Sequence, residues 1–139
     1  MIIPGFGAAP WRHHGRNRSG GHTPESWITR SRFRTDGRIE HLVEQINRRV
    51  PYPVGGLHKG SASAPSGGGH WSLVIGWDPD TPQLVMHDPN GEADLVIGGY
   101  VRTAIGSGQA LRDSERNWGR HWQVEGSGSG WWIQISTHQ

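Results

Sequence analysis

Glycine is the residue type that most constrains this chain. It occupies 22 of the 139 positions, more than twice its usual share of ~7%. Glycine destabilises helix interiors and marks turns, so this content favours strands and loops over long helices. Only 32% of the residues are hydrophobic, and the eight tryptophans supply much of the volume available for a core. The length suits one domain.

Cysteine is absent from the sequence. Its absence excludes disulfides, thiolate metal sites and a cysteine nucleophile carried by this chain. No apolar run approaches the ~18–20 residues of a membrane span. The start, Met1 to Gly5, lacks the basic and apolar segments of a signal peptide. We therefore expect a soluble protein made in a cytoplasm.

The charge is distributed unevenly along the chain. Residues 1–50 carry nine arginines against four acidic residues, a net of +5, whereas residues 51–139 carry five basic and eight acidic residues, a net of −3. Residues 1–24 are rich in glycine and proline and are predicted to form an irregular basic arm, ahead of one domain over residues 25–139. The arm is solvated, docks an acidic neighbour or binds nucleic acid. Arg30, Arg32 and Arg34 could contact phosphate, but no nucleic-acid motif accompanies them.

Periodicity predicts an α+β fold, a small antiparallel sheet with one main amphipathic helix. Residues 26–34 alternate as a strand with one basic face. Residues 36–49 form the helix, because Ile39, Leu42, Val43 and Ile46 follow the helical spacing. Further strands are predicted over residues 54–58, 70–77, 83–88, 93–97, 122–124 and 131–135.

The remaining segments are predicted to be loops, with residues 60–69 flexible and residues 98–117 irregular. Alternation in the strand over residues 70–77 places Trp71 and Trp77 on one face, where we expect both in the core. Trp131 and Trp132 are adjacent in a strand, so one ring should point inward and the other outward.

A histidine and an aspartate mark the predicted hairpin over residues 70–88. His70 begins its first strand and Asp88 ends its second. If the strands pair through the turn at residues 78–82, the two side chains come within hydrogen-bond reach. A histidine oriented by a carboxylate is the base half of a catalytic triad. The alternative is that both are ordinary turn or surface residues.

The surrounding sequence adds a family resemblance. The strings Gly67–Trp77 and Val85–Glu92 resemble papain-like cysteine peptidases of the bacteriocin-processing type. They are most similar to the relatives found in bacteriophage lysins and tail-associated cell-wall peptidases. The segments Gly98–Val101, Asn117-Trp118 and Trp122–Trp131 look like the carboxy-terminal part of the phage versions. The resemblance covers about residues 26–135.

The resemblance implies three roles: a cysteine attacks the peptide carbonyl, a histidine is base and then acid, and an aspartate orients it. His70 and Asp88 match the last two roles, whereas the cysteine and the helix that carries it are missing. The resemblance thus implies a truncated papain-like half-fold. The implied function is a degenerate phage peptidase-like domain for peptidoglycan peptides, inactive alone.

Three alternatives remain at this point. The chain could be a non-catalytic virion or tail assembly protein that contacts another virion protein, in the phage virion or the host cytoplasm. Ser26 could replace the cysteine, but it falls in a predicted strand where no helix begins. His58, His70, His87 and Asp88 could hold a zinc ion, but His87 and Asp88 should point to opposite faces. We predict no metal and no cofactor.

Overall fold

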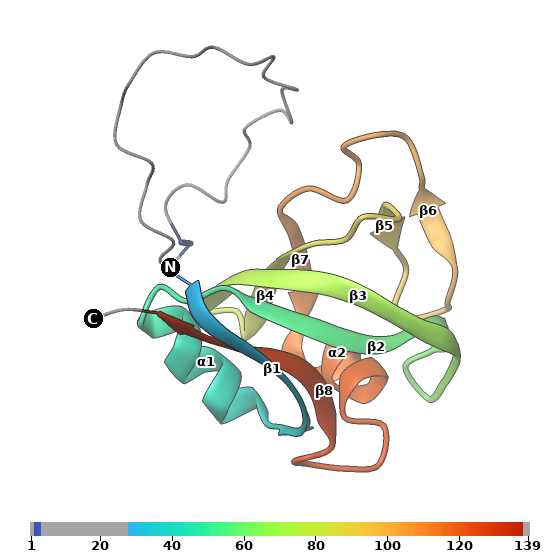
Figure 1. The fold of residues 1–139 in the computed structure, drawn as a ribbon. Helices are drawn as coiled ribbons and strands as arrows, with labels where there is room; N and C mark the ends of the chain where they lie inside the picture. The colour runs from blue at the N-terminus through green and yellow to red at the C-terminus, as the bar shows by residue number, and fades with distance from the viewer. Residues whose placement is uncertain (1, 4–27, 138–139) are drawn as a thin grey trace, which may run out of the picture.

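The structure is a computed structural model that describes residues 2–3 and 28–137 (Figure 1). Its elements, in chain order, are β1 (Ile28–Gly37), α1 (Ile39–Asn47), β2 (Tyr52–Ser61), β3 (Ala64–Asp78), β4 (Gln83–His87), β5 (Glu92–Ala93), β6 (Tyr100–Arg102), β7 (Leu111–Ser114), α2 (Glu115–Trp122) and β8 (Gly130–Thr137). The predicted α+β class is confirmed. No helix of the described residues is long and apolar enough to cross a membrane.

Six strands form one sheet in the order β1-β8-β2-β3-β4-β7, and each neighbouring pair is antiparallel. β5 and β6 pair separately as a short two-stranded ribbon. β8, which comes last among these strands, lies between β1 and β2 (Figure 1). The sheet is thus completed by pairing between opposite ends of the described chain.

Both helices pack on the same face of the sheet, which we call the inner face (Figure 1). The core combines buried aliphatic side chains of α1 and of the strands with tryptophans. The ring of Tyr52 stacks on Trp132 at 4.5 Å between centroids, and Trp118 stacks on Trp122 at 4.9 Å. Trp132 is buried and Trp131 exposed, so the predicted split of this pair is confirmed.

Two glycines make room for the indole of Trp122. Gly37 and Gly130 pair where β1 meets β8. A Cβ atom at either glycine would overlap the Trp122 ring. The indole Nε1 donates to the carbonyl oxygen of Trp131 at 2.8 Å. Glycine at these positions therefore lets α2 lie close against the strands.

The main helix is shorter than predicted. Expected over residues 36–49, α1 begins at Ile39 and ends at Asn47. Asp36 does not cap it, because its Oδ1 accepts hydrogen bonds from Arg34 Nε at 2.9 Å and from Trp132 Nε1 at 3.1 Å. These bonds hold the pKa of Asp36 well below its ordinary value and keep the residue in β1.

A second helix, α2, lies where sequence analysis expected irregular chain and a strand. The predictions over residues 98–117 and 122–124 were wrong: the first segment contains β6, β7 and the start of α2, and Trp122 ends that helix. The backbone N–H of Asn117 donates to Ser114 Oγ at 3.2 Å, which caps the helix. Trp118, His121 and Trp122 are all buried, on one helical face.

The predicted flexible loop over residues 60–69 is mostly strand. β2 and β3 continue through it as a hairpin, with Leu57 opposite Gly69 and Ser61 opposite Ala64. The strand expected over residues 54–58 is therefore longer. The strand expected over residues 93–97 is shorter, because Asp94 Oδ1 accepts from the backbone N–H groups of Val96 and Ile97 and bends the chain.

An irregularity in β3 places the two tryptophans that were expected in the core on opposite faces of the sheet. The pairing register with β4 shifts between Val74 and Gly76, a bulge that interrupts the alternation. Trp77 packs against the core, as predicted. Trp71, before the bulge, lies on the outer face of the sheet and is exposed, so that prediction was wrong.

Two residues of the predicted arm lie within the described structure. The N–H of Ile3 donates to the carbonyl oxygen of Ile75 at 2.9 Å, and the Ile3 side chain is buried in the core. Ile2 forms a bridge with Gly76. The rest of the arm and Ser26 lie outside the described residues.

Candidate active site

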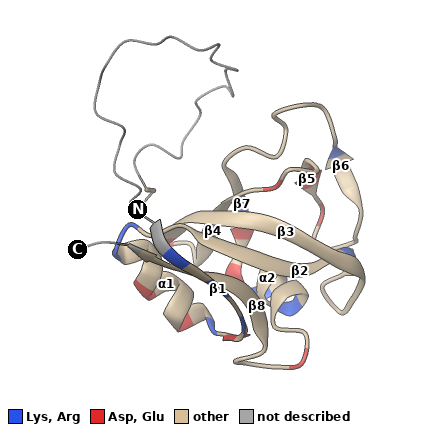
Figure 2. Cartoon of the chain, viewed as in Figure 1, with Lys and Arg blue, Asp and Glu red and all other residues tan. Residues whose placement is uncertain are grey.

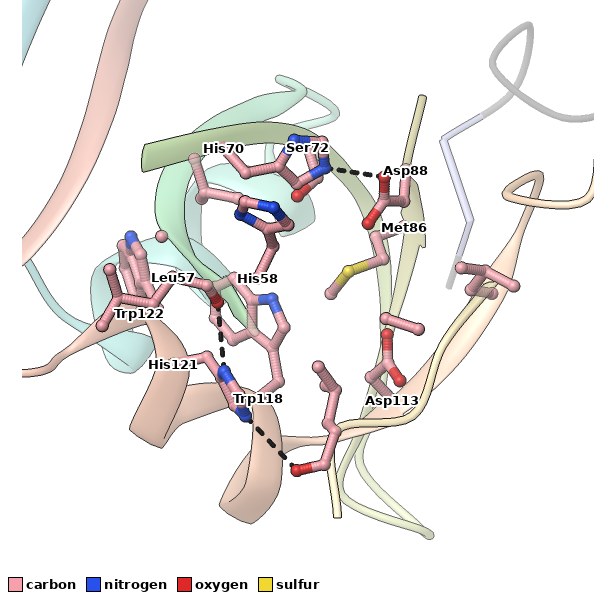
Figure 3. A pocket seen from close by; sticks show the side chains of 15 residues that line it. Leu57, His58, His70, Ser72, Met86, Asp88, Asp113, Trp118, His121 and Trp122 are labelled. Atoms are coloured by element: carbon pink, nitrogen blue, oxygen red, sulfur yellow. Dashed lines mark hydrogen bonds and ion pairs between the residues drawn. The ribbon is translucent and has the colours of Figure 1, made fainter. Parts of the chain in front are cut away.

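His70 and Asp88 meet on the inner face of the sheet (Figure 3). His70 lies in β3 and Asp88 directly follows β4, and the pairing of Leu73 with His87 brings them together. His70 Nε2 lies 2.7 Å from Asp88 Oδ1, with side-chain exposures of 12% and 9%. The contact expected from the hairpin is confirmed.

The hydrogen bond between His70 and Asp88 determines which imidazole nitrogen of His70 carries the proton. A carboxylate only accepts, so Nε2 of His70 donates to it. In the neutral ring, Nδ1 then carries the lone pair. The side-chain Nδ2 of Asn90 lies 3.5 Å from this Nδ1. His70 is thus oriented as a base with Nδ1 as the atom that would take a proton.

Asp88 is held by donors from three segments. Its Oδ1 also accepts from the backbone N–H of Asn90 at 2.8 Å, and its Oδ2 accepts from the Tyr100 hydroxyl at 3.3 Å. Burial, with the charge of Asp88 as the second cause, raises the pKa of Tyr100 to about 12, so the phenol keeps its proton. The backbone N–H of Asp88 donates to Gly108 O at 2.8 Å. The carboxylate is therefore fixed in position.

A small cavity lies beside the pair. It measures about 30 Å³, which is room for one or two waters. His58, Ser72, Asp113 and His121 contribute polar groups to its wall (Figure 3). A peptide would have to lie across its mouth, since so small a cavity holds no side chain of ordinary size.

His58, which the sequence suggests only as a candidate metal ligand, is a close neighbour of His70. Its ring centroid lies 5.0 Å from that of His70. Its Nδ1 donates to the carbonyl oxygen of Gly68 at 3.0 Å, which ties the ring to the β2–β3 hairpin. Periodicity predicts the strand that ends at His58 but not its pairing with β3, which brings His58 beside His70.

His121 is a buried histidine whose position in the sequence shows no metal-ligand spacing. Its Nδ1 lies 3.0 Å from the carbonyl oxygen of Leu57, and its Nε2 lies 3.3 Å from that of Leu95 (Figure 3). Its ring thus connects α2 to β2 and to the segment after β5. The sequence does not predict these contacts, because it does not predict the helix α2 that carries His121.

Asp113, in β7, is the second carboxyl group of the cavity wall (Figure 3). Burial, followed by the negative charges of Asp88 and Glu92, raises the pKa of Asp113 to about 6. The sequence gives no sign of this group, because its short strand lies in a segment predicted to be irregular. A carboxyl group with a raised pKa in the wall of a cavity is a feature of many catalytic sites.

We predict that Asp113→Asn raises the free energy of unfolding by about 3 kcal/mol at pH 7. A raised folded-state pKa means that the folded protein binds the proton more tightly. The wild-type protein therefore loses stability as the pH rises from ~4 to ~6, and the asparagine variant avoids that loss.

Urea titrations of both proteins at pH 3.5 and pH 7 measure this difference. The two should have nearly equal stability at the lower pH and separate at the higher one. Asp80→Asn, at an exposed turn, is the control and should show no such separation. A pH-independent difference for Asp113→Asn would contradict the assignment.

Of the four residues considered as zinc ligands, three line the cavity and His87 does not. The Nδ1 atom of His87 instead accepts a hydrogen bond from the backbone N–H of Ala110 at 3.0 Å. Among residues 2–3 and 28–137, no group of three or more histidine, aspartate or glutamate side chains could hold a metal ion.

Comparison of the chain with protein-family models, with curated proteins and with solved structures finds no match.

Proposed function

We propose that this chain is a papain-like peptidase domain of the phage cell-wall type that keeps the base and the orienting carboxylate but lacks the nucleophile. It engages peptides of peptidoglycan and does not hydrolyse them alone. The observation that carries the proposal is the 2.7 Å bond between His70 Nε2 and Asp88 Oδ1, which leaves Nδ1 as the basic atom.

The arrangement matches the roles that the resemblance implies. His70 would accept a proton at Nδ1 and Asp88 would stabilise the resulting imidazolium. The contacts of Asp88 with Tyr100 and Asn90 fix the carboxylate, which in turn keeps the His70 imidazole in one orientation. Such a half-site provides general-base chemistry to any nucleophile that reaches Nδ1.

The missing nucleophile limits what the chain does alone. The sequence holds no cysteine, and removing the nucleophile of a triad abolishes nearly all of its rate enhancement. A thiol from another polypeptide would complete the site. We therefore expect peptide binding without measurable turnover by the isolated chain.

The test uses purified protein and soluble cross-linked peptidoglycan peptides. Binding is followed by the NMR signals of the His58 and His70 rings, and turnover by the release of free amino groups. We expect the ring signals to shift without amine release, and His70→Ala to weaken binding about tenfold, or 1.4 kcal/mol. His41→Gln, on α1 away from the cavity, is the matched control.

Two results would decide against this proposal. Amine release that is lost in His70→Ala would show that the chain hydrolyses peptides by itself. No binding of any cell-wall peptide would remove peptidoglycan as the substrate.

A non-catalytic role in virion or tail assembly is the second candidate. The observations that favour it are the lack of cysteine and the net charge of +5 over residues 1–50, from nine arginines against four acidic residues. This role predicts salt-sensitive binding to an acidic virion protein that His70→Ala leaves unchanged. Loss of that binding in the His70 variant would favour the peptidase-like function.

A further inference from the structure

Three aromatic side chains lie exposed together on the outer face of the sheet, opposite the helices. They are Phe33 in β1, Trp71 in β3 and Trp131 in β8, with exposures of 52%, 41% and 51%. The centroid of the Phe33 ring lies 6.1 Å from that of Trp71 and 5.7 Å from that of Trp131. These three residues form one surface feature, which we call the outer aromatic cluster.

The glycine in the middle of this cluster determines how one indole lies. Gly55 of β2 pairs with Trp71 on one side and with Trp131 on the other. A Cβ atom at Gly55 would come within 3.1–3.3 Å of three atoms of the Trp71 indole. The indole therefore lies across β2, with one side against the glycine backbone, while much of the ring remains open to solvent.

The side chains next to the cluster on this face carry no charged group, and the ionisable His87 lies beyond Leu73, opposite it in β4. Strand alternation and pairing place Ser31, Pro53, Leu73 and Ile133 on this side of the sheet, and none of them is ionisable. β8 contains no Lys, Arg, Asp or Glu and is tan throughout in Figure 2. Arg32, opposite Gln134, alternates to the other face. This surface thus suits a neutral ligand better than a polyanion.

The size of the cluster favours a small ligand over a second protein. Fully exposed aromatic side chains offer 150–250 Å² each, so three half-exposed rings provide about 300 Å². Stable protein interfaces bury about 800 Å² on each partner. An area of this size fits a few sugar units.

We propose that the outer aromatic cluster binds the glycan of the bacterial cell wall, a chain of N-acetylated hexosamines. Aromatic ring faces carry partial negative charge and attract the C–H groups on the apolar face of a pyranose. The choice of this glycan rests on the proposed function. The geometry of the cluster is observed independently of that function. Glycan and peptide would then contact opposite faces of the sheet.

The test titrates the protein with the N-acetylglucosamine tetramer and follows tryptophan fluorescence. We expect saturable binding that weakens about tenfold or more in Trp71→Ala and in Trp131→Ala. Ile105→Ala, which removes a fully exposed apolar side chain elsewhere, is the matched control and should bind like the wild type. Circular dichroism of each variant checks that it is folded, and a folded Trp131→Ala protein decides the matter if Trp71→Ala does not fold.

The outcomes separate this proposal from the function proposed for the inner face. His70→Ala should keep tetramer binding, even if no peptide binds to the wild type. Absence of tetramer binding by the wild type would overturn the glycan site. Concentration-dependent dimerisation that is lost in Trp131→Ala would also overturn it, because a second copy would then occupy the cluster.

Discussion

Replacing Trp122 with alanine is expected to lower the free energy of unfolding by about 3–5 kcal/mol. Trp122 is only 2% exposed. Its ring stacks on Trp118 and contacts Tyr52 edge to face at 5.9 Å between centroids. The substitution removes these contacts, leaves a cavity between α2 and the strands, and deprives the carbonyl oxygen of Trp131 of its donor.

Urea unfolding followed by circular dichroism measures the loss. Trp131→Ala is the matched control, since it removes the same side chain from an exposed position on β8. We expect it to cost less than about 1 kcal/mol. Similar losses in the two variants would contradict the central place of Trp122 in the core.

Gly108→Ala is expected to separate Asp88 from His70 and to cost about 1–3 kcal/mol of stability. A Cβ atom at Gly108 would overlap the carbonyl oxygen of Asp88. The same two residues are joined by the hydrogen bond from Asp88 N to Gly108 O at 2.8 Å. The backbone that carries the orienting carboxylate must therefore move.

The proton between His70 Nε2 and Asp88 Oδ1 reports this movement. A hydrogen-bonded imidazole proton gives a distinct downfield NMR signal, which should be lost or shifted in Gly108→Ala. Gly69→Ala is the control, because Gly69 precedes His70 and its added Cβ would meet no atom within 4 Å. An unchanged signal in Gly108→Ala would show that the loop absorbs the methyl group.

The parts of the fold that sequence predicted well are local. The β3–β4 hairpin follows from alternation on both sides of a proline-containing turn, and its pairing, together with the bulge between Val74 and Gly76, brings His70 to Asp88. The helical spacing of Leu42 and Ile46 likewise predicted the buried face of α1. In these cases, neighbours in the sequence determine both the element and its orientation.

The parts that sequence missed depend on distant contacts. Gly119 and the flanking tryptophans obscured α2, which is stabilised by packing Trp118 and Trp122 against the sheet. Tyr100 and Asp113 come to the site on strands whose partners could not be read from short-range pattern. The bulge in β3 changed the side of the sheet that a tryptophan faces, and the local sign of it is Gly76, a glycine inside the strand pattern.

The insertion of β8 between β1 and β2 has a consequence for folding. Arg34 and Gln134, which contact across β1 and β8, are 100 positions apart in the chain. Such distant pairing makes folding slow, since a long loop must close before the contacts form. During synthesis, the edges of β1 and β2 that pair with β8 stay unpaired until β8 has been made. Two copies that exchanged β8 would satisfy the same edges, so refolding at high protein concentration should yield domain-swapped dimers.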